Sequence, residues 1–290
     1  MTSDTSRRDL LKTLGAAGAG AMLSLGSLAA QDAKKSAIKG PGRIDVHHQY
    51  SFSMDGTYPN TKATWTPQAS LEQMDKHFFG SGADQAAALR AGQTVVWAGG
   101  EDGILSVSGG LIHHWHARIL LPHVSLEDVV AVSRSYTDYP DIFGPIVAAR
   151  VLSDTGENLV VQFRMKESAG GMSATLDMRS RIRYVRVDRR RVYSTAASEE
   201  IVEIKDPGGP GERRLAPGHD SGYLWRASSF SRFVEDDGGV YMDMETVGLS
   251  RQFPPLLGWF IEPIARRIGR RSVENSVNEF KRAVLARMAR

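Results

Sequence analysis

The chain contains no cysteine in its 290 residues. This absence excludes disulfide bonds, thiolate catalysis, iron–sulfur clusters and cysteine-ligated zinc. An excess of one charge sign is also lacking: the net charge is only +3, which does not favour nucleic acid as a partner. The sequence after residue 30 shows no repeat and no low-complexity tract. Hydrophobic residues make up 41% of the chain, enough to build the core of a globular protein.

No hydrophobic run reaches the length of a membrane-spanning helix. The longest, Leu14–Ala30, has 17 residues, four of them glycine, against the ~20 that a bilayer requires. It follows the pair Arg7-Arg8 and ends in two alanines, which suit signal-peptidase cleavage. These features resemble a twin-arginine export signal, with Leu10 where phenylalanine is commoner. The alternatives are a chance arginine pair before a cytosolic helix and an uncleaved anchor.

The signal implies a location and a first partner. We expect residues 1–30 to be a cleaved twin-arginine signal peptide that engages the twin-arginine export machinery. Signals of this type imply export of an already folded protein. The predicted location is therefore periplasmic or otherwise extracytoplasmic.

Residues 31–108 are predicted to form an N-terminal extension that packs on the following domain. Ser70–Phe79 and Ala83–Ala91 have the composition of short helices, separated by glycines that break the pattern. Thr94–Trp97 is a short run of β-forming residues. The sequence does not decide whether this extension closes a pocket or forms a separate contact surface.

From residue 109 onward the pattern becomes regular. Ser125 and Asp128 are spaced for a helix N-cap close to a capping box, and that helix is expected to end near Tyr139-Pro140. Alternating hydrophobic runs separated by turn residues predict strands. The expected strands are Leu111–Leu121, Ile146–Leu152, Asn158–Lys166, Arg179–Val187, Val192–Ile204, Tyr223–Glu235 and Val240–Leu249.

A closing helix is predicted from about Ser272 to Ala289. Its apolar side chains recur at helical spacing, at Val273, Val277, Phe280, Val284 and Met288. A curved antiparallel sheet has one face to bury, and a single long helix laid across it buries that face. The order of elements therefore predicts an α+β helix-grip fold, in which a curved antiparallel sheet wraps a long C-terminal helix and encloses a cavity.

Short motifs in the same region carry a resemblance. They are Gly109–Trp115, Tyr136–Pro140, Tyr223–Arg226 and Gly238–Tyr241. In these segments the chain resembles the START-like (SRPBCC) superfamily, which includes lipid-transfer domains, coenzyme-Q-binding proteins and polyketide cyclases. The resemblance covers about residues 109–290 and implies the helix-grip fold. None of its motifs is catalytic.

Strand alternation predicts which side chains face the cavity. A two-residue turn at Asp237-Gly238 pairs Phe233 with Met242, and it places charged side chains such as Asp243 on the opposite face. The cavity face is then rich in methionine, aromatic and hydroxyl side chains, which suits a hydrophobic ligand. The same residues could instead pack as a solid core. The predicted ligand-binding residues are Trp115, Phe163, Tyr184, Trp225, Ser229, Phe233, Met242, Met244 and Phe280.

Four histidines near the first strand invite a metal interpretation. His114 and His116 share one strand face, opposite Trp115, but no carboxylate lies at a matching nearby spacing. We therefore expect no metal site at His113, His114, His116 or His123, and no cofactor.

Catalytic motifs are sparse. The sequence has no nucleophile elbow and no dinucleotide-binding strand–GxGxxG–helix unit. Acid–base catalysis would need carboxylates in the cavity. The nearest cluster of carboxylates is Glu199, Glu200 and Glu203, which we expect at an open, solvent-exposed end of a strand. A cyclase could polarise a carbonyl with buried polar groups, for which the candidates are Tyr184, Arg183 and Tyr223.

Two basic concentrations remain, at Arg179–Arg191 and Arg266–Arg290. The first interpretation is a pair of solvated surfaces. The second is docking to an anionic membrane surface, with the apolar stretch Phe253–Ile261 entering the interface. That stretch could equally be a lid over the cavity. Nucleic-acid binding is disfavoured because aromatic residues do not interleave with the basic runs.

The sequence thus favours an exported protein that binds or carries a hydrophobic small molecule, such as a lipid, quinone or polyketide-like compound. The main alternative is a cavity enzyme of the cyclase or dehydratase type. A third is an envelope-associated scaffold whose cavity is filled by its own side chains.

Overall fold

The computed structural model describes residues 43–47, 50–53, 63–64, 83–98, 103–107, 110–169, 172–216, 218–236, 238–251 and 255–289. One ten-stranded antiparallel sheet dominates these residues, with the order β4-β6-β13-β12-β10-β9-β8-β7; β5 pairs with β6 and β11 with β10. Its strands are β4 (Val95–Ala98), β5 (Ile104–Val107), β6 (Gly110–Pro122), β7 (Ile146–Asp154), β8 (Asn158–Ala169), β9 (Met172–Asp188), β10 (Arg191–Lys205), β11 (Arg213–Arg214), β12 (Arg226–Asp236) and β13 (Gly239–Arg251).

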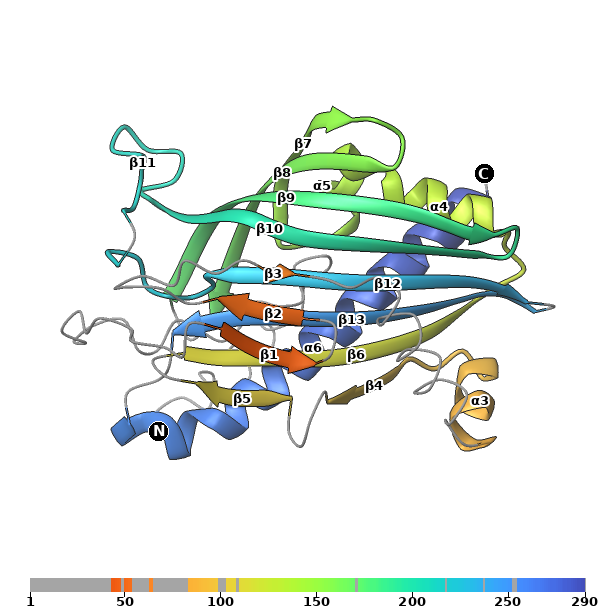
Figure 1. Cartoon of the computed structure of the whole chain (residues 1–290), viewed down its shortest axis with the longest axis horizontal. Helices are drawn as coiled ribbons and strands as arrows, with labels where there is room; N and C mark the ends of the chain where they lie inside the picture. The colour runs from red at the N-terminus through yellow and green to blue at the C-terminus, as the bar shows by residue number, and fades with distance from the viewer. Residues whose placement is uncertain are drawn as a thin grey trace, which may run out of the picture.

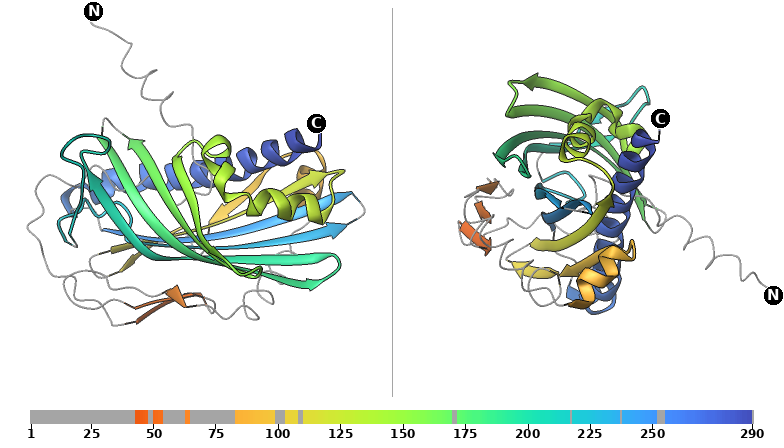
Figure 2. Two further views of the ribbon diagram at one scale, coloured as in Figure 1. Left: turned by 90° about the horizontal axis from the view of Figure 1, so that it is seen from above. Right: turned by 90° about the vertical axis from the view of Figure 1, so that its right-hand side faces the viewer.

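A separate three-stranded sheet contains β1 (Arg43–His47), β2 (Tyr50–Ser53) and β3 (Ala63–Thr64). The helices are α3 (Ala83–Arg90), α4 (Leu126–Arg134), the short 3-10 helix η2 (Tyr136–Asp138), α5 (Tyr139–Ile142) and α6 (Pro255–Met288). The large sheet curves around α6, which runs along its concave side, while β1–β3 lie on the opposite side (Figure 1, Figure 2). The predicted helix-grip fold is confirmed.

The predicted hairpin register is also confirmed. Phe233 pairs with Met242, and Arg232 pairs with Asp243 in the β12–β13 ladder. Because side chains alternate across a strand, this register separates an apolar inner face from a charged outer face. The separation of apolar from charged residues along the sequence therefore predicted the correct pairing of β12 with β13.

Helix α4 starts as predicted but ends earlier. Ser125 Oγ accepts a hydrogen bond from the Asp128 amide at 3.2 Å, and the Asp128 carboxylate accepts one from the Ser125 amide at 3.2 Å, completing a capping box. The helix stops at Arg134, not near Tyr139, since η2 and α5 follow as separate turns. The break turns Tyr136 and Tyr139 into the core.

Helix α6 is longer than predicted, with 34 residues beginning at Pro255 and not at Ser272. Gly269 disfavours helix in a sequence-based prediction, but here it permits close packing. A Cβ atom at Gly269 would lie 2.7 Å from Trp115 Nε1 on β6, so only glycine lets the helix approach the strand. The predicted apolar stripe is buried from Val273 to Val284, whereas Met288 is 47% exposed and does not belong to it.

Part of the N-terminal extension joins the main sheet. The predicted helix near residues 83–91 is α3, and the predicted strand near 94–97 is β4. β4 and β5 both pair with β6, so the sheet includes strands on the N-terminal side of residue 109. The predicted helix Ser70–Phe79 lies outside the described residues. Among the helices of the described ranges, none is both long and apolar enough to cross a membrane.

Candidate functional site

A cavity of about 110 Å³ lies between the sheet and α6. Its walls come from β8, β9, β10, β12, β13 and α6, and from the α4–α5 segment. The lining consists of aromatic, methionine and small aliphatic side chains together with several hydroxyl groups. None of the lining residues that the structure describes is charged.

The structure brings most of the predicted ligand-binding residues together at this cavity. Those that line it are Phe163, Tyr184, Ser229, Phe233, Met242, Met244 and Phe280. The cavity is also lined by residues that strand alternation alone did not single out, because they come from the α4–α5 segment and the next strands. Among these are Tyr136, Tyr139, Phe143, Met178 and Ser276.

The two predicted tryptophans are placed elsewhere. Trp115 packs against Gly269 of α6 and is not part of the cavity lining. Trp225 precedes β12 by one residue, and its Nε1 donates to Asp220 Oδ1 at 3.0 Å beneath the Arg251 guanidinium. Neither tryptophan lines this cavity, because alternation gives the face of a side chain but not its distance along the sheet, and their part in ligand binding stays a prediction.

Hydroxyl groups gather where the α4–α5 segment meets β9. Tyr184 OH lies 2.7 Å from Tyr136 OH and 3.1 Å from Ser133 Oγ, and it donates to the Ser133 carbonyl oxygen at 2.8 Å. Tyr139 OH donates to the same carbonyl at 2.7 Å. Burial raises the pKa of the Tyr136, Tyr139 and Tyr184 hydroxyls, so all three stay protonated at neutral pH. This end of the cavity is polar but uncharged.

Sequence analysis singled out Tyr223 but missed two carboxyl groups with buried oxygen atoms, Glu167 and Glu279. Glu167 follows Phe163 and Met165 on the same face of β8, and burial, together with the charge of Glu279, raises its pKa to about 8. Glu167 Oε1, Tyr223 OH and Glu279 Oε2 are buried and have no hydrogen-bond partner within the described part of the chain. Glu167 could have been found by extending the alternation of β8 by two residues.

The other catalytic candidates do not reach the cavity. Glu199, Glu200 and Glu203 line a separate, open hollow of about 400 Å³. Glu200 pairs with Arg214 at 2.8 Å, and Glu203 accepts from the Ser221 amide and hydroxyl. Arg183 is exposed, Tyr223 lines the open hollow, and of the three predicted carbonyl-polarising residues only Tyr184 lines the cavity.

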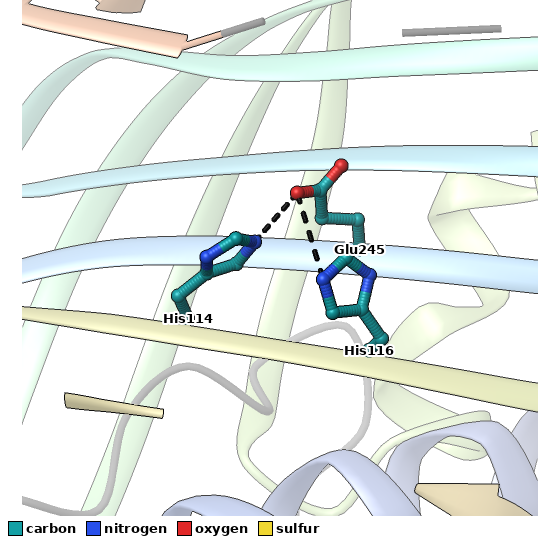
Figure 3. Close-up of side chains that lie close together, drawn as sticks. All are labelled: His114, His116 and Glu245. Carbon is teal, nitrogen blue, oxygen red and sulfur yellow. Dashed lines mark hydrogen bonds and ion pairs between the residues drawn. The ribbon is translucent and has the colours of Figure 1, made fainter. Parts of the chain in front are cut away.

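His114 and His116 project from the face opposite Trp115, as the sequence predicted, but the prediction that no carboxylate accompanies them is wrong. A carboxylate does lie beside them: Glu245 of β13 is directly opposite His116 of β6. Glu245 Oε1 is 2.5 Å from His114 Nε2 and 3.8 Å from His116 Nε2 (Figure 3). The sequence could not show this, since residues 116 and 245 meet only through a long-range strand pairing. His113 points to the other face, where its Nε2 is 2.8 Å from Ser250 Oγ.

A second charged group lies beside the histidines on this outer face. Asp243, which is fully buried, accepts from Arg118 Nε at 2.5 Å and from Arg232 Nε and Nη2 at 3.0 and 2.9 Å. The three residues come from β6, β13 and β12. The central strands of the sheet are therefore buried on both faces.

The first basic run, Arg179–Arg191, is largely paired with carboxylates. Arg179 and Arg181 bond Glu199, Arg186 bonds Glu127, and Arg191 bonds Asp188. In the apolar stretch, Phe253 and Pro254 lie outside the described residues, and α6 begins at Pro255. Contact with an anionic membrane stays a prediction.

Comparison with known protein families supports the export signal. Residues 4–24 match the family described as the twin-arginine translocation pathway signal sequence. No curated protein matches the chain in sequence.

Three solved structures illustrate the likeness of the fold. A STAR-related lipid transfer protein from Xanthomonas axonopodis is 15% identical with a TM-score of 0.42, covering 63% of this chain and 99% of its own. The Zhui aromatase/cyclase from a Streptomyces species is 17% identical with a TM-score of 0.39, covering 62% and 94%. A START superfamily protein from Mycobacterium smegmatis is 8% identical with a TM-score of 0.37, covering 60% and 97%.

These scores are low, and the helix-grip assignment rests on the strand order and on the long C-terminal helix. The chain carries a twin-arginine signal sequence for export across the cytoplasmic membrane, and the exported part folds as a helix-grip domain.

Proposed function

We propose that this exported protein binds or carries an uncharged hydrophobic small molecule in the cavity between the sheet and α6. The observation that carries the proposal is the character of the lining: aromatic, methionine and hydroxyl side chains, with no charged side chain among the described lining residues. Such a lining selects a ligand by its shape and by apolar contact, and a few hydroxyl groups orient it. A charged ligand would lose its hydration without gaining a counter-charge.

The cavity volume narrows the class of ligand. An apolar cavity of roughly 150 Å³ holds one benzene ring, so the 110 Å³ seen here matches a single ring or a short chain. Met178, Met242 and Met244 are unbranched and change rotamer easily, which allows the cavity to widen around a guest. A ring that bears carbonyl or hydroxyl oxygens, as in a quinone or a polyketide-like compound, fits better than a lipid with two acyl chains.

The polar end of the cavity gives the ligand an orientation. Tyr136, Tyr139 and Tyr184 are neutral hydroxyls held in a bonded network with Ser133. A carbonyl oxygen on the ligand could accept a hydrogen bond if one hydroxyl turned toward it. Tyr184 is the residue best placed to do so, because it lines the cavity at the centre of this network.

Native mass spectrometry of the exported protein tests the proposal. We expect a co-purified hydrophobic molecule that organic extraction releases, and saturable binding of the neutral dye Nile red to the emptied protein. Ala227 lines the cavity, so A227F should fill it and weaken dye binding at least tenfold. Ala148 is exposed on β7, and A148F is the matched control. Equal binding by wild type and a folded A227F would refute the proposal.

A second candidate function, a cavity enzyme of the cyclase or dehydratase type, is favoured by Glu167 and Tyr223. Both are buried with an unpartnered oxygen, and a carboxyl group with a pKa of about 8 can donate a proton at neutral pH. Neither lines the cavity in this structure, so the carrier is preferred. If an identified ligand is converted to a product and E167Q abolishes turnover while binding persists, the enzyme is the correct function.

A further inference from the structure

We propose that His114, His116 and Glu245 bind one divalent transition-metal ion of the zinc type on the outer face of the sheet. This site lies on the side of the sheet opposite α6 and is independent of the cavity and of its ligand.

The register brings the three ligand groups to one point. His114 and His116 are two residues apart on β6, so both side chains project from the same face. Glu245 lies on the adjacent strand β13, directly opposite His116, and projects from that face as well. Figure 3 shows both imidazole rings and the carboxylate converging.

The distances are close to those of a coordination shell. One donor atom from each residue lies within 4.8 Å of the other two, with Glu245 Oε1 at 2.5 Å from His114 Nε2 and 3.8 Å from His116 Nε2. Bond lengths of about 2.0–2.2 Å in a tetrahedral zinc site place ligand atoms ~3.3 Å apart. Small side-chain rotations, opening the first distance and closing the wider ones, would convert this cluster into that geometry.

Burial and charge favour a cation. The Glu245 side chain is 1% exposed, and its Oε2 atom has no hydrogen-bond partner among the described residues. A buried carboxylate with an unsatisfied oxygen is costly, and a metal ion would satisfy it.

The surroundings hold the ligands in place. The Trp97 ring stacks on His116 with the ring centroids 5.2 Å apart and the planes 6° apart. Phe230, which is fully buried, lies opposite Glu245 on β12. Aromatic walls on both sides restrict the rotamers of the ligands and exclude water, which strengthens electrostatic binding.

The ligand set selects the class of metal. Two imidazole nitrogens and one carboxylate oxygen suit first-row divalent ions and do not suit calcium or magnesium, which prefer oxygen alone. Three protein ligands leave one tetrahedral position for a fourth donor. Because a twin-arginine substrate folds before export, the ion would be acquired in the cytoplasm, together with the pairing of β6 and β13.

The competing interpretation is a buried hydrogen-bonded pair of His114 and Glu245, without metal. The two interpretations predict different metal contents for the purified protein. The test uses the exported protein, purified without a histidine tag, with metal measured by mass spectrometry and zinc affinity measured by competition with a chromogenic chelator. Cobalt(II) replaces zinc as a spectroscopic probe, because tetrahedral cobalt absorbs visible light strongly.

The variants are H114Q, H116Q and E245Q, with H113Q as the matched control. His113 is equally buried and adjacent in sequence, but it faces the other side of the sheet and contacts Ser250. We expect one zinc per wild-type chain, retention of that zinc in H113Q, and a fall in affinity of at least about 100-fold in each ligand variant. Far-UV circular dichroism shows which variants fold.

Two results would overturn the proposal. The first is wild-type protein that neither contains zinc nor binds added zinc or cobalt, and whose thermal midpoint does not change when zinc or a chelator is added. The second is a folded H116Q or E245Q variant that binds zinc as tightly as H113Q does. The wild-type measurement decides the question even if every ligand variant fails to fold.

Discussion

Replacement of Asp243 by asparagine should destabilise the protein severely. Asp243 is fully buried between the guanidinium groups of Arg118 and Arg232, with N···O distances of 2.5–3.0 Å. Asparagine keeps the shape of the side chain but removes its charge. Two buried cations would then face each other across the sheet without the carboxylate that neutralises them.

The magnitude follows from the geometry. Each Arg–Asp attraction is about 4 kcal/mol at a charge separation of ~4 Å and an effective dielectric constant of about 20. The repulsion between Arg118 and Arg232 is present in the wild type and in D243N alike, so it does not enter the difference. Removal of the Asp243 charge therefore removes about 8 kcal/mol of attraction. Relaxation and water entry reduce the measurable loss to about 3–5 kcal/mol, as for other broken buried ion pairs.

Urea unfolding followed by circular dichroism measures this loss. A loss of 3–5 kcal/mol should lower the thermal midpoint by roughly 6–20 °C for a domain of this size. The matched control is D177N. Asp177 faces Arg164 across β8 and β9 with similar bonds of 2.7 and 3.0 Å, but the two side chains are 22% and 32% exposed.

For D177N we expect a loss below about 1 kcal/mol, because water replaces the interaction. The reasoning is refuted if D243N and D177N lose the same stability, or if D243N loses less than 1 kcal/mol. A further check is the triple replacement R118M/D243L/R232M. It should recover most of the stability lost in D243N, because an apolar set leaves no buried charge.

Three further predictions concern the helix, the buried acid and the signal. F280A removes a buried side chain of α6 that packs on Phe233, and it should lower the free energy of unfolding in urea by about 3–5 kcal/mol. The control M288A, at an exposed position, should change that free energy by less than about 0.5 kcal/mol. Equal effects of the two replacements would show that the apolar stripe is not buried. Burial raises the pKa of Glu167 from 4.5 to about 8, so between these pH values the folded state holds a proton that the unfolded state has released. The stability of the wild type should therefore fall relative to that of E167Q as the pH rises from about 4.5 to 8, by up to about 5 kcal/mol. Parallel profiles of stability against pH for the two proteins would contradict the prediction. Replacement of Arg7 and Arg8 by lysine should leave the uncleaved precursor in the cytoplasm, detected by fractionation, whereas a precursor processed at the wild-type rate would mean that another route exports it.

The sequence was sufficient for the order of the long strands and of the two main helices, because local patterns carry that information, whereas the short strands β5 and β11 were not predicted. The Ser125–Asp128 capping box and the segregated hairpin around Asp237 both depend on neighbours within a few residues. The start of α6 was not predictable in the same way. Gly269 counts against a helix locally, and its reason, the contact with Trp115, lies more than 150 positions away in the sequence.

In the candidate site, too, features set by local sequence were predictable and features set by long-range contacts were not. Six cavity residues on strands were predictable, since alternation gives the face of each strand, and Phe280 was predictable from the apolar stripe of the helix. To place Trp115 and Trp225 relative to the cavity, one must know how far along the sheet the cavity extends. Alternation placed His114 and His116 on one face of their strand, but only the pairing of β6 with β13 brings Glu245 beside them.

The edge strands β4 and β5 have a consequence for handling this protein. Both cover β6, a strand of 13 residues that would otherwise present open backbone donors and acceptors along one side of the sheet. Uncovered edges of this kind recruit strands from other molecules and promote aggregation. A shortened version starting at residue 109 would lack that protection, so we expect poor solubility from it, and laboratory versions should begin upstream of α3.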